Sequence, residues 1–133
     1  MFLDNFYNQN QTDITISAEQ GSNFAKSISN DFNPIHDPDS KRFCVPGDLL
    51  FALVLQRYGL SQDMSFSFAG MVGSDTGLLF PASPGAEFEI VDGRDKSYLQ
   101  VSRSGDIVNN EQIIEQLVKN YVVFSGQNFP HLL

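Results

Sequence analysis

Apolar residues alternate with polar ones in some stretches of the chain and recur every three to four positions in others, and these periods predict strands and helices respectively. Residues 1–12 are polar and rich in Asn and Gln, which predicts a loosely held N-terminal arm. Residues 12–17 alternate and predict a short strand. Ser17 and Gln20 then have the spacing of a capping box, in which each side chain bonds the backbone N–H of the other. A helix is expected to follow, with one apolar face that carries Phe24, Ala25 and Ile28.

This helix is expected to stop before Pro34, because a proline keeps the residue before it out of helical geometry. Residues 31–43 contain two prolines and several polar turn formers, and they predict an ordered loop. A second helix is expected to start after Pro46. Its residues 49–55 are apolar on all sides, which is typical of a buried helix. Gly59 is expected to end it as a C-cap.

The second half of the chain has mostly strand patterning. Short strands are expected at residues 65–71, 78–80, 87–92, 97–103 and 121–125. Residues 104–106 read Ser-Gly-Asp and predict a hairpin turn. Residues 110–119 fit helical spacing, and both helix and strand stay open for them. The order of elements predicts an α+β domain over residues 13–133, with a helix packed on an antiparallel sheet.

Composition narrows the class of protein. The 133 residues suggest one domain, and 41% of them are hydrophobic, which is enough for a core. A net charge of −8 repels phosphate backbones and argues against binding to nucleic acid. Cys44 is the one cysteine, so no intramolecular disulfide is expected, and it is expected to be a small buried hydrophobe. No signal peptide is apparent, and the longest apolar run, residues 49–55, is too short to cross a bilayer. These features predict a cytoplasmic protein without membrane insertion.

Asp31 and His36 are the candidate catalytic residues. They flank Asn33-Pro34, a turn-forming pair, and a carboxylate and an imidazole held over a pocket can move a proton to or from water. The alternative is a tight turn with a helix-ending aspartate and a surface histidine. No second His or Cys lies at ligand spacing, so no metal site is expected.

The segment from Asp31 to His36 fits the motif D-x-N-P-I-H, and two weaker motifs follow at residues 46–50 and 80–88. On these motifs the chain resembles MaoC-like hydratases, the hotdog-fold group that includes the (R)-specific enoyl-CoA hydratases. The resemblance covers roughly residues 15–125, and only its first motif is specific. It implies a single hotdog fold, with an antiparallel sheet wrapped around a buried central helix. It also implies a homodimer with its sites at the interface.

The resemblance further implies that Asp31 and His36 activate water for addition to an enoyl thioester, or catalyse the reverse dehydration. The N–H of Gly47 would polarise the thioester carbonyl. Substrate-binding roles are expected for three further residues, Asn33, Phe66 and Phe68. The substrate is expected to be a small-molecule acyl thioester with CoA as the carrier, and no cofactor is expected.

The chain departs from the family pattern beside the motif. The linker of residues 37–47 is shorter and more charged, and Pro46 stands where the family has His. Asp48 follows Gly47 where an apolar residue is usual, and residues 49–55 contain no hydroxyl. Two alternatives therefore stay open beside the hydratase. One is a non-catalytic module that binds an acyl thioester or lipid, and the other is a thioesterase in which Asp31 directs water at the carbonyl carbon.

Overall fold

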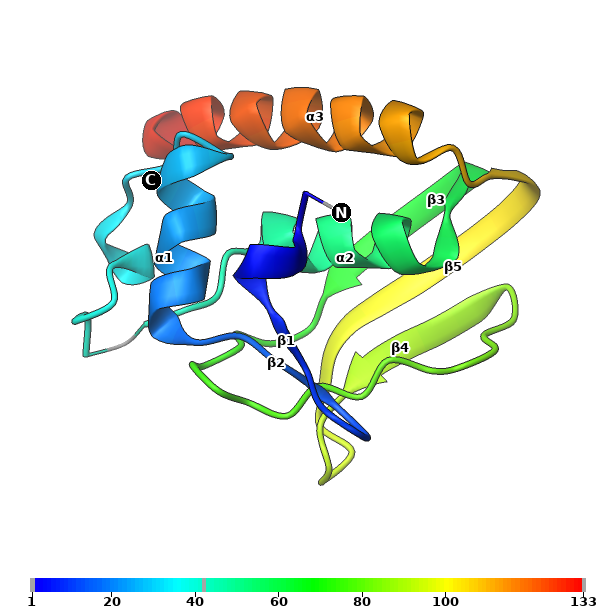
Figure 1. The fold of residues 1–133 in the computed structure, drawn as a ribbon, viewed down its shortest axis with the longest axis horizontal. Helices are drawn as coiled ribbons and strands as arrows, with labels where there is room; N and C mark the ends of the chain where they lie inside the picture. The colour runs from blue at the N-terminus through cyan, green and yellow to red at the C-terminus, as the bar shows by residue number, and fades with distance from the viewer. Residues whose placement is uncertain (1, 42, 133) are drawn as a thin grey trace.

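The computed structural model describes residues 2–41 and 43–132, and the side chains of these residues up to position 121. In chain order the elements are the short 3-10 helix η1 (Asp4–Phe6), β1 (Asn8–Gln9), β2 (Ile14–Thr15), α1 (Ala18–Ser27), the 3-10 helix η2 (Pro34–His36), α2 (Gly47–Tyr58), β3 (Leu60–Phe68), β4 (Glu87–Val91), β5 (Ser97–Val108) and α3 (Glu111–Leu132). Figure 1 shows α3 running along one side of α2, with the three longest strands on another side. The chain is therefore a mixed α+β structure, as predicted.

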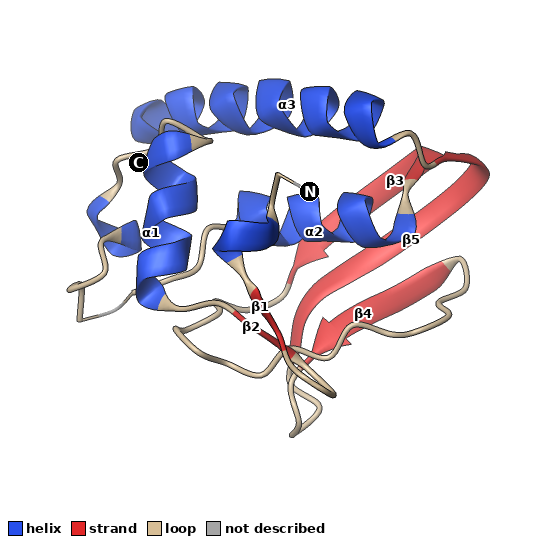
Figure 2. Cartoon of the chain, viewed as in Figure 1, coloured by secondary structure: helices blue, strands red, loops and turns tan. Residues whose placement is uncertain are grey.

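The strands form two antiparallel ladders. The larger has the order β3-β5-β4, in which Val101 of β5 lies opposite both Phe66 of β3 and Phe88 of β4. The smaller pairs β1 with β2. Two isolated bridges, from Leu78 to Ile14 of β2 and from Leu79 to Val91 of β4, join the ladders. The strands gather on one side of α2 in Figure 2, so together they make the surface on which this helix packs.

Helix α2 forms the centre of the core, as its apolar sequence predicts. Its buried residues are Leu49, Leu50, Ala52, Leu53, Val54 and Leu55. They belong to one cluster with Leu78, Ile90, Leu99 and Val101 from the strands. Gly59 ends the helix at a φ of +85°, a backbone conformation that favours glycine, and its N–H donates to the Leu55 carbonyl. The predicted buried helix and its C-cap are both confirmed.

Helix α1 begins with the predicted capping box. The Ser17 hydroxyl accepts from the Gln20 N–H at 3.1 Å, and the Gln20 side chain accepts from the Ser17 N–H at 2.9 Å. The helix ends at Ser27, and Asn30 has a φ of +52°, which turns the chain out of the helical direction. Because of this change in direction, the segment that starts at Asp31 lies beside the end of α1.

The first nine described residues are not loosely held. Leu3 is fully buried in the main core cluster, and β1 pairs with β2 through Asn8 and Gln9. The predicted loose arm is therefore wrong over this stretch. The sequence hides the contact because one buried leucine stands among polar residues and produces no periodicity.

Two predictions in the second half are also wrong. No hairpin turn occurs at residues 104–106, because β5 continues through them to Val108. Gly105, with a φ of +86°, lies where the pairing with β3 shifts register between Ser61 and Asp63. Residues 121–125 are helical and not a strand, because they belong to α3, which extends from Glu111 to Leu132. The same helix includes residues 111–119, for which both helix and strand had stayed open.

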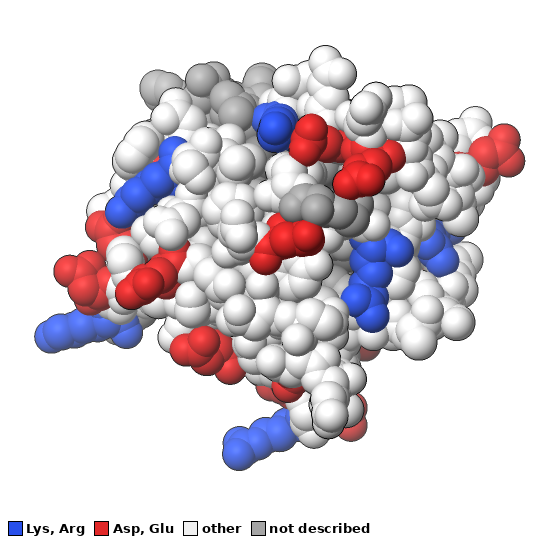
Figure 3. Space-filling view, in the orientation of Figure 1, with Lys and Arg blue, Asp and Glu red and all other residues white. Residues whose placement is uncertain are grey.

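Charge is not concentrated on the face seen in Figure 3, where acidic and basic side chains are interspersed. Among the helices of the described chain, none is long and apolar enough to cross a membrane.

Candidate functional site

A tight turn after α1 carries the candidate pair. The Asp31 N–H donates to the Ala25 carbonyl at 2.7 Å, which anchors the turn to the end of α1. One carboxylate oxygen of Asp31 accepts from the Asn33 N–H at 3.0 Å. The Asn33 side-chain oxygen accepts from the Ile35 N–H at 3.2 Å and caps η2. The motif therefore folds as a local network in which Asn33 shapes the turn.

Asp31 and His36 meet in a buried setting. The Oδ2 atom of Asp31 lies 3.5 Å from Nε2 of His36, and the two residues are 6% and 8% exposed. Nδ1 of His36 lies 2.7 Å from the Cys44 carbonyl oxygen. A carbonyl oxygen only accepts, so Nδ1 carries the hydrogen of this bond. In the neutral imidazole, Nε2 is then an acceptor that faces another acceptor, and a water molecule placed beside the pair can donate to both.

The pair opens on a cavity of about 460 Å³, which is within the range of small-molecule sites. The loop from Asp31 to His36 supplies one wall, and residues 44–48 at the start of α2 supply another. Residues 70–72, after β3, and Tyr121 of α3 also line it, together with Leu50 and Phe68. Segments that are far apart in the sequence therefore converge on the candidate pair.

Gly47 is the first residue of α2 and lines this cavity, as does Phe68. A Cβ placed on Gly47 would lie 3.2 Å from the Phe68 ring, so the ring packs directly on the start of the helix. Pro46 occupies the N-cap position and makes no side-chain cap. N–H groups in the first turn of a helix have no partner within the helix and lie at its positive end. Asp48 lines the cavity from the same turn.

Two predicted substrate-binding residues lie outside the cavity lining. Asn33 belongs to the turn, and Phe66 lines a separate hollow between α2, β3 and α3. The Phe66 ring contacts Phe51 edge-on, with 4.9 Å between ring centroids. Asp31, His36, Gly47 and Phe68 are the predicted site residues that the structure brings together.

Cys44 and Tyr121 are among the cavity residues that sequence reasoning missed. Cys44 is half-buried and lines the cavity, whereas a small buried hydrophobe was expected at this position. Burial raises the pKa of this thiol, and a hydrogen bond from the Val72 backbone partly opposes the increase. A thiol with a raised pKa is a weak nucleophile near neutral pH. Tyr121 was missed because its strand-like neighbours hid the helix that carries it.

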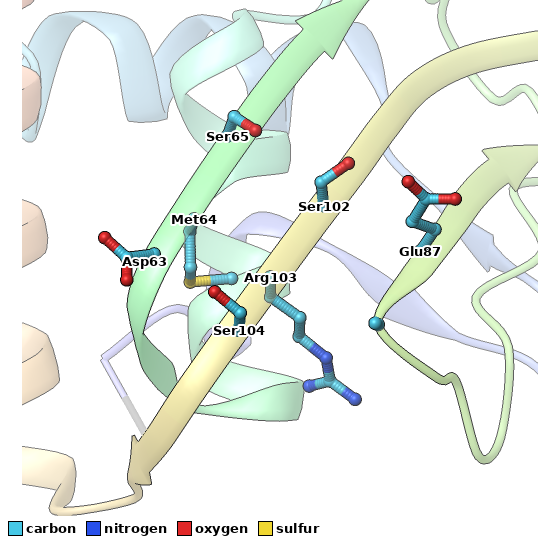
Figure 4. Close-up of a pocket in the computed structure, with 8 residues that line it drawn as sticks. Asp63, Met64, Ser65, Glu87, Ser102, Arg103 and Ser104 are labelled. Atoms are coloured by element: carbon cyan, nitrogen blue, oxygen red, sulfur yellow. The ribbon is translucent and has the colours of Figure 1, made fainter.

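Another hollow, of about 490 Å³, lies on the outer face of the sheet and is lined by Asp63, Met64, Ser65, Ala86, Glu87, Ser102, Arg103 and Ser104. Figure 4 shows the Ser65, Ser102 and Glu87 side chains across three neighbouring strands. Polar residues on one face are expected in an antiparallel sheet whose other face packs on the core. No group of three or more metal-ligating side chains occurs in the part of the chain that the structure describes. The cavity at Asp31 and His36 is therefore the candidate site.

Comparison with known proteins identifies a family for this chain but does not indicate an activity. A family model described as "Protein of unknown function (DUF3581)" matches residues 1–133. No curated protein and no solved structure matches the chain.

Proposed function

We propose that this chain, which belongs to the DUF3581 family of unknown function, hydrates an enoyl thioester or catalyses the reverse dehydration. One observation carries the proposal. The Asp31 carboxylate and the His36 imidazole face each other, 3.5 Å apart, on a cavity that also borders the first turn of α2. These are the acid–base pair and the carbonyl-polarising group that conjugate addition of water requires.

In the proposed reaction, a water molecule donates one hydrogen to Oδ2 of Asp31 and the other to Nε2 of His36. As the water oxygen bonds to C3 of the enoyl thioester, one of its protons passes to the pair. The pair returns this proton to C2, so the net change is addition of one water. The Cys44 carbonyl supports this arrangement, because it holds the hydrogen of His36 on Nδ1 and leaves Nε2 free to accept.

The first turn of α2 would stabilise the enolate that forms between these steps. Negative charge develops on the thioester oxygen, and the Gly47 N–H lies at the positive end of the helix beside the cavity. Loss of one such donor typically costs about 3 kcal/mol of transition-state stabilisation. The Phe68 ring on Gly47 would help to exclude water from this donor.

The proposal includes a single hotdog fold and a homodimer. The antiparallel strands around the buried α2 support the fold. Large apolar side chains around the cavity support a second copy, because Phe32 and Met71 are each 63% exposed and Phe68 is 52% exposed. Strand β3 also lies at an edge of the three-stranded sheet. The measured mass in solution tests this part of the proposal.

A non-catalytic thioester-binding protein is the second candidate. Asp48 favours it, because a carboxylate on the cavity wall near the Gly47 N–H opposes negative charge on the substrate oxygen. In addition, Gly47, Asp48 and Leu50 are the α2 residues that line the cavity among the described ones, and none carries a hydroxyl.

Purified protein with crotonyl-CoA separates these functions. We expect loss of the conjugated enoyl absorbance without release of free thiol. Thiol release would instead support a thioesterase, with Asp31 directing water at the carbonyl carbon. Saturable binding with neither reaction would support the non-catalytic candidate, and absence of both binding and reaction would refute the proposal.

A further inference from the structure

Tyr121 of α3 stands between two hollows. Among the described side chains it is the one that lines both the cavity of Asp31 and His36 and the hollow that contains Phe66. Its ring packs on Phe51 of α2, with 4.7 Å between ring centroids. Tyr121 is 48% exposed, so solvent borders it on one side.

The second hollow has a volume of about 340 Å³ and suits an apolar ligand. The described residues that line it besides Tyr121 are Phe51, Leu55, Leu60, Ser61, Gln62, Met64 and Phe66. Among the described side chains that line it, aromatic, aliphatic and thioether groups predominate, and the polar groups are Ser61, Gln62 and the Tyr121 hydroxyl. The apolar side chains of this wall can pack against an alkyl chain, and no charged side chain stands among the described ones that line it.

We propose that this hollow receives the distal part of the acyl chain, and that Tyr121 sets the longest chain that enters. The inference rests on the proposed function, because that function places an acyl thioester in the first cavity. Tyr121 borders both hollows, and the α2 residues that line them follow on from Leu50 to Phe51, so an acyl chain that passes Tyr121 along α2 would enter the second hollow.

Distances along α2 indicate which chains are affected. With 1.5 Å of rise per residue, Phe51 lies about 6 Å and Leu55 about 12 Å along the helix axis from Gly47. A four-carbon acyl chain whose carbonyl is held at Gly47 ends near Phe51, before it passes Tyr121. An extended chain needs roughly ten carbons to span about 12 Å and reach the wall at Leu55. Tyr121 therefore discriminates between short chains and chains of ten or more carbons.

Binding of saturated thioesters tests the inference, because these ligands lack the double bond that hydration consumes. The dissociation constants of butyryl-CoA and dodecanoyl-CoA are measured for the wild type, Tyr121→Ala and Tyr121→Leu by calorimetry. In both variants we expect the dissociation constant of dodecanoyl-CoA to fall by about tenfold relative to that of butyryl-CoA. Burial of two further methylene groups is sufficient for that change. Leu117→Ala is the matched control, because Leu117 lies one turn earlier on α3 and lines neither hollow. Adding Phe66→Trp to Tyr121→Ala narrows the second hollow and is expected to remove the gain.

An unchanged ratio of the two dissociation constants in both Tyr121 variants would overturn the inference. A gain that persists with Phe66→Trp, or failure of both thioesters to bind, would also overturn it. Crotonyl-CoA hydration by the wild type reports on the proposed function separately, because its short chain does not need the second hollow. If the wild type hydrates crotonyl-CoA but the ratio of the two dissociation constants is unchanged in the Tyr121 variants, the inference is refuted and the proposed function still stands.

Discussion

Replacing Asp31 separates its chemical role from its role in the turn. In Asp31→Asn, the amide oxygen can accept from the Asn33 N–H in place of Oδ1, and the amide nitrogen can donate to Nε2 of His36 in place of Oδ2. The bond to Asn33 loses the benefit of a charged acceptor, worth about 1 kcal/mol, while the new bond to His36 contributes about as much. We therefore expect the free energy of unfolding to stay within about 1 kcal/mol of the wild type, or about 4 °C in Tm.

The hydration rate of Asp31→Asn is expected to fall steeply, although its free energy of unfolding changes little. The amide nitrogen occupies Nε2 of His36 and removes the carboxylate that orients water, so the rate with crotonyl-CoA should fall by about 10² to 10⁴. In contrast, Asp31→Ala leaves the Asn33 N–H without its acceptor and should cost about 1–3 kcal/mol in addition to the lost activity.

Asp37→Asn is the matched control for charge. Asp37 belongs to the same loop and pairs with Lys26 at 3.0 Å, and it lies outside the cavity lining. This exposed ion pair contributes less than about 1 kcal/mol, so neither stability nor hydration should change appreciably. An Asp31→Asn variant that unfolds readily would show that the carboxylate is chiefly structural. A fully active, stable Asp31→Asn variant would refute the acid–base role.

Three further variants or measurements test other parts of the structure. Leu3→Ala should cost about 2–5 kcal/mol in urea unfolding, because Leu3 is fully buried, whereas a truly loose arm would give no change. Alkylation of Cys44 should be slower than that of a free cysteine near neutral pH and should accelerate as the pH rises through the raised pKa of the thiol. Bound butyryl-CoA should protect Cys44, and binding without protection would contradict its position in the cavity. Asp48→Asn should lower stability by about 0.3–1 kcal/mol through the helix dipole and raise the hydration rate, since it removes a charge that opposes the enolate. A lower rate would mean that the carboxylate assists the reaction.

Sequence patterns predicted the elements that depend on neighbouring residues. The capping box at Ser17 and Gln20 and the C-cap at Gly59 are confirmed, because each is a hydrogen-bonding arrangement completed within about one helical turn. The apolar run of α2 also identified the centre of the core. Local chemistry decides these features, so the sequence contains what is needed to predict them.

The wrong predictions occurred where distant contacts decide the structure. Ser-Gly-Asp at residues 104–106 has the composition of a hairpin turn, but pairing with β3 makes Gly105 part of a register shift within a continuous strand. Residues 121–125 are rich in aromatic and β-branched residues, which favour strands. The earlier turns of the same helix, α3, pack Ile114 and Val118 into the core, and this tertiary contact outweighs local propensity.

The candidate site depends on both kinds of information. Its turn follows from the local sequence, but backbone hydrogen bonds between distant segments bring that turn to α2. The Cys44 N–H donates to the Ile35 carbonyl at 2.9 Å, and the Val45 N–H donates to the Val72 carbonyl at 2.8 Å. The Cys44 carbonyl then fixes His36. Any residue other than proline can donate these backbone hydrogen bonds, so no residue pattern predicts them. A chain could therefore keep the motif from Asp31 to His36 and lose the site. The orientation of His36 by residue 44 is thus stronger support for a proton-transfer site than the motif alone.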